Sequence, residues 1–210
     1  DELARFESFY GWAVFDHNNR VLLVDRSLDR ALFGPIDGHS SPMISTVKIP
    51  EPIVAESSDG KLVLSTADPF LAEVRNSATW AEISILKGHQ GAVTGAVFAP
   101  DSRWVMTVSE DGKAAVWDVA TGRMEHDFRL DNRGYIALIS PDGRWVTAVA
   151  DWSSITIWDT STWQPIHKYT WPAPQSGGNW TKSAAFSPDS ARLAVGDDRG
   201  NLRVLDVLNG

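Results

Sequence analysis

The sequence predicts an all-β fold built from five consecutive repeats, each of four short antiparallel strands. The first observation behind this prediction is a motif that recurs about every 42 residues along the chain. The second is that short apolar runs alternate with tight-turn residues inside each period. No window holds a sustained apolar stripe of helical period, so we expect very little helix. A fixed period of this length is typical of folds that stack one supersecondary unit many times.

A turn residue ahead of an apolar run anchors each repeat. The five anchors are Asn18, Asp59, Asp101, Asp142 and Asp189, spaced by 41, 42, 41 and 47 residues. The repeats they define are residues 9–50, 51–90, 91–131, 132–175 and 176–210. Trp117 and Trp158 keep the same spacing of 41, and each is followed by an aspartate. Repeated Trp positions, including Trp104 and Trp145, are predicted to pack between neighbouring repeats.

Within the third repeat, three turns separate four predicted strands. They lie at residues 100–102, 110–112 and 120–122, and contain Pro, Asp, Ser, Thr and Gly. Proline presets φ, glycine accepts a positive φ, and an aspartate side chain bonds the backbone of its own turn. Runs of about five residues between such turns are typical of antiparallel strands. Because an aspartate recurs at one turn in repeat after repeat, we expect a structural role for it.

The third repeat also resembles the WD40-repeat family. Gly88-His89 precedes its first strand, Ser109 and Asp111 lie at its second turn, and Trp117-Asp118 closes its third strand. The resemblance implies a β-propeller, and it implies that His89, Ser109, Asp111 and Trp117 form a buried hydrogen-bonded tetrad. A buried indole N–H and a buried imidazole both require polar partners. The tetrad is therefore expected to be structural.

The resemblance covers the whole chain and is strong in the third to fifth repeats, moderate in the second and weak in the first, while the tetrad pattern itself decays outside the third. Trp152 stands where the fourth repeat would carry the tetrad aspartate, Leu205-Asp206 replaces Trp-Asp in the fifth, and Arg75-Asn76 replaces it in the second. Residues 1–8 occupy the place of a fourth strand for the last repeat. Pairing there would close a five-bladed ring as one domain, residues 1–210, without an exposed sheet edge. A longer propeller of which these repeats are a part is the alternative.

Composition limits the classes of partner. The net charge is −8 and the pI about 5.0, which argues against a nucleic-acid surface. There is no cysteine, no apolar stretch of membrane-spanning length and no signal-like N-terminus. We therefore expect no membrane association and a cytoplasmic location.

The residues predict no catalytic site, no metal site and no small-molecule cofactor. His126 and His167 occupy equivalent places on the outer strands of successive repeats, where side chains diverge, so they are expected to be exposed. Most aspartates fall at repeated turn positions, and no nucleophile motif is present. A glycoside hydrolase with an acidic pair in a central channel is the weaker alternative.

Three tryptophans do not recur. Trp152 lies in a loop of the fourth repeat, and Trp171 and Trp180 flank the connection to the fifth. We expect these loops to open on one face and to form a docking surface with Asp151 and Asp198, because loops carry function and Trp is common in binding hot spots. The alternative is that the tryptophans cover the backbone of their own loop. The predicted function is a non-catalytic scaffold for a protein or peptide partner, and a carbohydrate-binding, lectin-like propeller is the second hypothesis.

Overall fold

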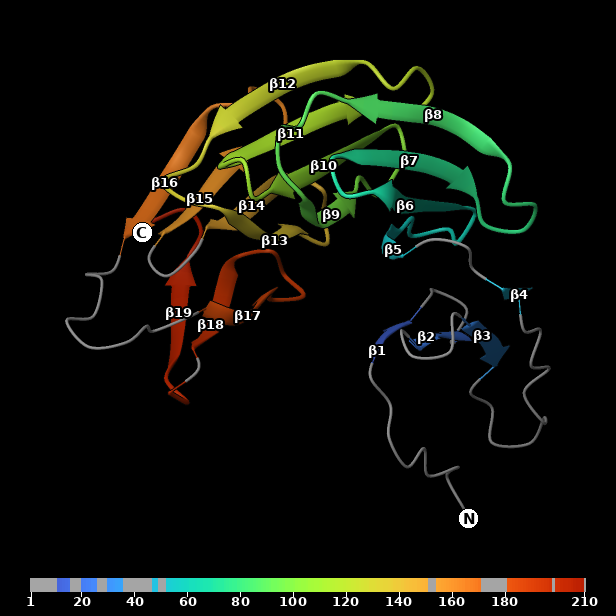
Figure 1. Ribbon diagram of the computed structural model, residues 1–210. Helices are drawn as coiled ribbons and strands as arrows, with labels where there is room; N and C mark the ends of the chain where they lie inside the picture. The colour runs from blue at the N-terminus through green and yellow to red at the C-terminus, as the bar shows by residue number, and fades with distance from the viewer. Residues whose placement is uncertain are drawn as a thin grey trace, which may run out of the picture. The chain divides into compact units, whose positions relative to one another are not determined.

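The computed structural model of the 210-residue chain divides into two compact units, Asp1–Ile53 and Val54–Gly210. The residues described are 52–150, 154–170, 181–197 and 199–209, together with the backbone of four earlier strands. Every regular element within these ranges is a β-strand, and none is a helix (Figure 1). The prediction of an all-β class is confirmed.

The first unit holds one antiparallel sheet, in which the strands pair in chain order. Its strands are β1 (Gly11–Phe15), β2 (Arg20–Asp25), β3 (Arg30–Pro35) and β4 (Val47–Lys48). The longest pairing joins β2 to β3, from Arg20 opposite Pro35 to Asp25 opposite Arg30. The apolar run Val21–Val24 lies in the middle of this pairing, as expected of a strand between two turns.

The second unit holds four sheets, and each is again antiparallel with its strands in chain order. The first two consist of β5 (Ile53–Glu56), β6 (Leu62–Asp68), β7 (Leu71–Asn76) and β8 (Glu82–Lys87), and of β9 (Val93–Phe98), β10 (Trp104–Ser109), β11 (Lys113–Asp118) and β12 (Met124–Arg129). The last two consist of β13 (Gly134–Ile139), β14 (Trp145–Ala150), β15 (Ser154–Asp159) and β16 (Pro165–Thr170), and of β17 (Thr181–Phe186), β18 (Arg192–Asp197) and β19 (Leu202–Asp206). These sheets confirm the four-stranded antiparallel repeat. The last sheet has three strands among the described residues, and the predicted closing strand at residues 1–8 lies outside them.

The first turn of each sheet in the second unit is held by an aspartate. The carboxylate accepts a hydrogen bond at 3.1 Å from the backbone N–H two residues later, and the acceptors are Asp59, Asp101, Asp142 and Asp189. The residue after each aspartate has a positive φ: 68° at Gly60, 59° at Ser102, 74° at Gly143 and 60° at Ser190. An aspartate that bonds its own turn stabilises this conformation. The prediction that the repeated aspartates serve turns is confirmed.

The apolar core lies between neighbouring sheets. Trp117, with no exposed surface, packs in one cluster with Leu64 and Leu86 of the preceding sheet. The next clusters hold Trp158 beside residues of the β9–β12 sheet, and Trp145 beside residues of the β17–β19 sheet. The repeated tryptophans therefore pack between repeats, as the spacing predicted, and each sheet of the second unit contributes apolar side chains to a cluster shared with a neighbouring sheet of that unit.

The first strand of the fourth repeat, β13, lies close to the first strands of the two neighbouring sheets. β13 contacts both β9 and β17, and the Thr94 hydroxyl donates a hydrogen bond at 2.5 Å to the carbonyl of Gly134 (Figure 1). A Cβ on Gly95 would lie only 2.7 Å from the carbonyl oxygen of Tyr135. Glycine is therefore required where β9 meets the start of β13.

The histidines of the outer strands are not exposed, which corrects one expectation. His126 of β12 is half-buried, with its ring 5.0 Å from that of Trp163 and stacked 6.2 Å from Phe128. His167 of β16 is half-buried as well, and its Nε2 lies 3.1 Å from the carbonyl oxygen of Leu208. The expectation was wrong because a turn of the following sheet folds over each outer strand. The alternation of side chains along a strand does not by itself predict that a neighbouring turn will cover them.

Candidate functional site

Four buried or half-buried side chains of the β9–β12 repeat form one hydrogen-bonded network. The Trp117 Nε1–H donates to Thr107 Oγ1 at 2.8 Å, and the same oxygen lies 2.8 Å from His89 Nε2. The other imidazole nitrogen, Nδ1, lies 2.9 Å from a carboxylate oxygen of Asp111. An indole only donates and a carboxylate only accepts, so the Thr107 oxygen is the acceptor for Trp117 and the His89 Nδ1–H donates to Asp111. Every polar atom of the imidazole and the indole has a partner.

The strand register brings these side chains together. Trp117 of β11 lies opposite Val105 of β10, and Thr107 is two residues farther along β10 on the same face. That diagonal distance, roughly 7–8 Å between backbones, is within reach of an indole. The His89 ring, at a centroid distance of 5.8 Å, is tilted against Trp117 and covers the network.

The hydroxyl of the network belongs to Thr107, so the predicted role of Ser109 is wrong. The Ser109 hydroxyl donates to the Gly91 carbonyl at 2.9 Å and accepts from the Asp111 backbone N–H at 3.1 Å. Ser109 is four positions along the strand from the residue opposite Trp117, so it lies too far away for the indole to reach. The pairing register, which the sequence motif does not specify, makes this choice.

Asp111 joins the network to the turn between β10 and β11. Burial raises the pKa of its carboxyl, but hydrogen bonds from the Gln90 N–H, from His89 and from the Lys113 N–H outweigh burial and lower the pKa below its ordinary value. The carboxylate is therefore ionised and fully engaged at neutral pH. With both imidazole nitrogens bonded and 2% of the histidine side chain exposed, neither group is available to a substrate.

Neighbouring repeats place other groups at these positions. Arg75 stands where the second repeat would carry the tryptophan, and its guanidinium pairs with Glu73 and donates to the Trp80 carbonyl at 3.1 Å. In the fourth repeat, Trp158 lies opposite Val146, so the position equivalent to Thr107 is occupied by Ala148, which has no hydroxyl. The network of His89, Thr107, Asp111 and Trp117 thus distinguishes the β9–β12 repeat from these two.

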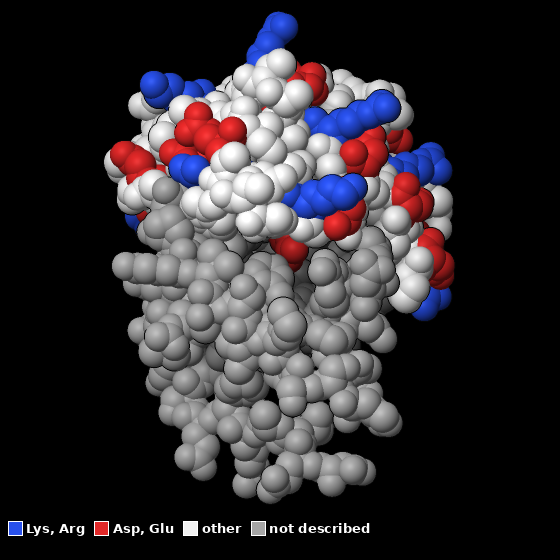
Figure 2. Space-filling view, turned by 90° about the vertical axis from the view of Figure 1, so that its right-hand side faces the viewer, with Lys and Arg blue, Asp and Glu red and all other residues white. Residues whose placement is uncertain are grey.

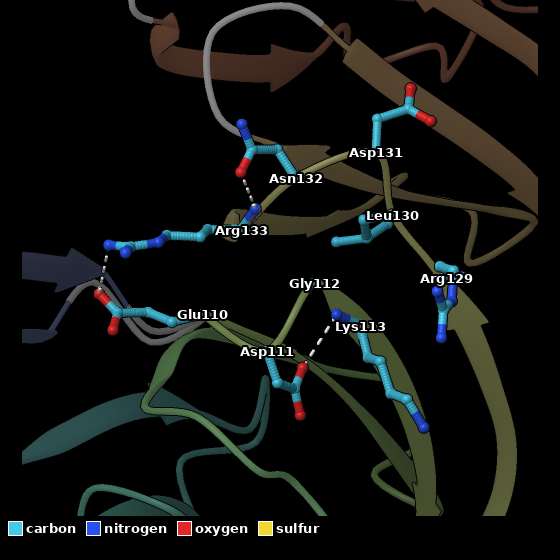
Figure 3. Close-up of a pocket in the computed structure, with 9 residues that line it drawn as sticks. All are labelled: Glu110, Asp111, Gly112, Lys113, Arg129, Leu130, Asp131, Asn132 and Arg133. Carbon is cyan, nitrogen blue, oxygen red and sulfur yellow. Dashed lines mark hydrogen bonds and ion pairs between the residues drawn. The ribbon is translucent and has the colours of Figure 1, made fainter.

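A polar cavity of about 380 Å³ opens at the same end of the sheet (Figure 3). One wall is the β10–β11 turn, Glu110–Lys113, and the other is the end of β12 with the connection to β13, Arg129–Arg133. The backbone N–H of Leu130 donates to the Gly112 carbonyl at 2.8 Å and so joins the two walls. The volume is in the range of small-ligand or side-chain pockets.

The other predicted site residues belong to loops of the fourth and fifth repeats and to the connection between them. Trp152, Trp171, Trp180, Asp151 and Asp198 lie outside the described residues. Within the described ranges, no group of three or more His, Asp or Glu side chains is arranged to hold a metal ion. The cavity was missed by sequence reasoning, because its walls are turns that look like the turns of every other repeat.

Comparison with known proteins identifies the repeat. Residues 80–118 match the model of the WD domain, G-beta repeat. The chain is a WD40-repeat protein. The matched segment includes all four members of the network, His89, Thr107, Asp111 and Trp117.

Relatives of this WD40-repeat protein cover different shares of it. The apoptotic protease-activating factor 1 of Rattus norvegicus is 30% identical over 155 residues, which are 73% of this chain and 12% of that protein. The U3 small nucleolar RNA-associated protein 21 of Saccharomyces cerevisiae is 30% identical over 121 residues, 56% of this chain and 12% of the relative. The target of rapamycin complex subunit LST8 of the same yeast is 38% identical over 47 residues, 22% of this chain and 16% of the relative. The chain thus spans about an eighth of the length of the first two relatives.

WD40 repeats serve in general as scaffolds for protein–protein interaction, and their family members are generally non-catalytic. Within the described part of this chain, no helix is long and apolar enough to cross a membrane.

Proposed function

We propose that this chain is a non-catalytic interaction module that docks a protein or peptide partner on the loops at one end of its sheets. The observation that carries the proposal is the network around Trp117. His89 and Asp111 are the groups most suited to acid–base chemistry, yet hydrogen bonds within the fold occupy both of them. A repeat that uses its titratable groups for structure supports binding by its surface loops better than it supports catalysis.

The relatives support the same function. One is named as a subunit of a complex and another as an RNA-associated protein, so both names place a WD40 chain within an assembly. For this chain we propose a protein partner and no direct contact with nucleic acid or membrane. The net charge is −8, and Figure 2 shows cationic and anionic side chains interspersed over the described part of one face. Nucleic acid requires a concentrated basic surface.

The closed five-bladed ring is part of the proposal. Five sheets follow the repeat spacing, and β19 is the outer strand of a sheet with three described strands. Residues 1–8 would supply its fourth strand. Hydrogen exchange tests this directly: deletion of residues 1–8 should deprotect the backbone amides of β19 that face the added strand, and unchanged protection would contradict closure by this segment. A fluorescent fusion imaged in cells would test the proposed cytoplasmic location.

Affinity capture from the native source tests the docking function. The bait is the chain itself, beside a variant with Trp152, Trp171 and Trp180 all changed to Ala, and beside Arg103→Ala as a surface control. We expect a partner that the wild type and the control retain and the triple variant loses, with little change in melting temperature. A large fall in melting temperature would mean that the tryptophans cover their own loop. Absence of a protein partner together with binding on a glycan array would replace the proposal by a carbohydrate-binding function.

A further inference from the structure

The cavity between the β10–β11 turn and the β12–β13 connection is lined by charged side chains, of which the carboxylates are more completely paired than the cations. Its lining includes three cations and three carboxylates, and Figure 3 shows them on both walls. The lining cations are Lys113, Arg129 and Arg133, and the lining carboxylates are Glu110, Asp111 and Asp131. The equal numbers of positive and negative side chains make the lining neutral overall. Which of these side chains can bind a ligand depends on whether each already has a partner within the fold.

The carboxylates are engaged by groups of the fold. Asp111 accepts hydrogen bonds from His89 and from two backbone N–H groups. Asp131 pairs with Lys168 outside the cavity at 2.5 Å. Glu110 lies 3.8 Å from Arg133, which reaches across the cavity toward it (Figure 3). A cationic ligand would therefore have to compete with an existing partner for each carboxylate.

The cations are less completely paired than the carboxylates. Arg129 is exposed and has no ion pair among the described residues. It lies directly opposite Lys113 in the β11–β12 pairing, so two like charges face each other across the strands. Lys113 is paired with Asp127 at 3.0 Å, which leaves the Arg129 guanidinium without a carboxylate. Like charges directly opposite are unfavourable in a sheet, and a bound anion would relieve that repulsion.

We propose that this cavity binds the carboxylate side chains of an acidic segment of the partner protein, with Arg129 as the principal contact. The inference rests on the proposed docking function and adds the chemistry of the partner. A guanidinium holds a carboxylate by two parallel hydrogen bonds, which gives direction as well as attraction. Since the whole chain carries a net charge of −8, an acidic segment is attracted only where cations are locally uncommitted.

Another unpaired arginine provides the matched control. Arg123 is exposed in the same sheet, has no ion pair among the described residues, and lies at the β11–β12 turn, the opposite end from Arg129. It does not line the cavity. Removal of either side chain takes one positive charge from the surface, so any difference between the two variants reports position and not net charge.

The test is fluorescence anisotropy of labelled hexaglutamate titrated with the intact chain at low salt, with labelled hexaglutamine as the neutral probe. We expect saturable binding of hexaglutamate only, weakened roughly tenfold by Arg129→Ala and unchanged by Arg123→Ala, with melting temperatures equal to wild type. Equal weakening by both variants, or no saturable binding, would overturn the site. Displacement of the peptide by inorganic phosphate at a much lower concentration than by free glutamate would assign the cavity to phosphate groups instead and overturn the acidic-segment proposal.

Affinity capture separates this site from the docking function. If Arg129→Ala still retains the partner that the wild type captures, the chain remains a docking module and the cavity is not its contact. If the variant loses the partner and Arg123→Ala keeps it, the acidic-segment site is supported in the native setting.

Discussion

The β9–β12 and β5–β8 sheets share one backbone plan and differ in their polar interior. Both pair their strands in chain order, and both contribute apolar side chains to the same core cluster. The β9–β12 sheet carries the Trp117 network, whereas the β5–β8 sheet has Arg75 at the equivalent position, paired with Glu73. The comparison teaches that repeated apolar positions and turns are sufficient for a sheet of this kind. Among the repeats whose side chains are described, the β9–β12 repeat carries this network in addition, and the network should concentrate stability there.

The largest expected effect comes from Trp117 itself. Trp117→Ala removes a fully buried ring and the indole donor to Thr107, so we expect a loss of about 3–5 kcal/mol in the free energy of unfolding. Arg75→Ala at the equivalent position should cost less, about 1–3 kcal/mol, because it leaves the buried Glu73 carboxylate without its partner. Urea denaturation of both variants measures the contrast. Equal losses would mean that the two sheets depend on this position to the same degree.

An intermediate loss of stability is expected when Thr107 is changed, and a smaller loss when Ser109 is changed. Thr107→Val keeps the shape of the side chain and leaves the Trp117 Nε1–H and His89 Nε2 without their shared partner, at a cost of about 1–3 kcal/mol. Ser109→Ala removes a hydroxyl that bonds only to the Gly91 carbonyl and the Asp111 N–H, so about 1 kcal/mol is expected.

The indole N–H resonance of Trp117 provides the second readout for this pair. Thr107→Val should shift it strongly, and Ser109→Ala should leave it near its wild-type position. The reverse order of the two shifts would restore Ser109 as the hydroxyl of the network.

The smallest effect is the pH dependence that Asp111 adds to the β9–β12 sheet. Its pKa in the folded state is lowered, since hydrogen bonds from Gln90, His89 and Lys113 outweigh burial. The carboxylate therefore contributes stability that is fully present above its unfolded pKa of about 3.9 and is lost as the pH falls toward the folded pKa. Asp111→Asn should be less stable than wild type at pH 7, and the difference should narrow below about pH 4. Urea denaturation at several pH values measures it, and a difference independent of pH would exclude this role.

Much of the fold follows from the local conformational preferences of the residues and can be predicted from the sequence. The spacing of Asp59, Asp101, Asp142 and Asp189 predicts the repeat, because an aspartate in a tight turn bonds the backbone two residues later wherever it occurs. The alternation of such turns with short apolar runs predicts the strands. The inter-sheet packing of Trp117 and Trp158 follows from the same repetition.

The site was less accessible to sequence reasoning. The choice of Thr107 over Ser109 depends on which residue of β10 lies opposite Trp117, and both hydroxyls lie on the same strand face. The cover over His126 depends on Trp163, which is 37 residues later and belongs to the next sheet. The cavity depends on the approach of the β12–β13 connection to the β10–β11 turn. Each of these features is a contact between two segments of the chain, and the repeat pattern of the sequence does not indicate which segments meet.

The sequence by itself determined the strand class, the repeat length and the turn aspartates of this protein, because these depend on the conformational preferences of a few adjacent residues. Only the tertiary structure decided which hydroxyl completes the Trp117 network, which histidines are covered, and which arginine is left without a carboxylate beside the cavity. The physical reason is that hydrogen bonds and ion pairs act over a few ångströms. Strand register and the approach of neighbouring sheets therefore select the partners.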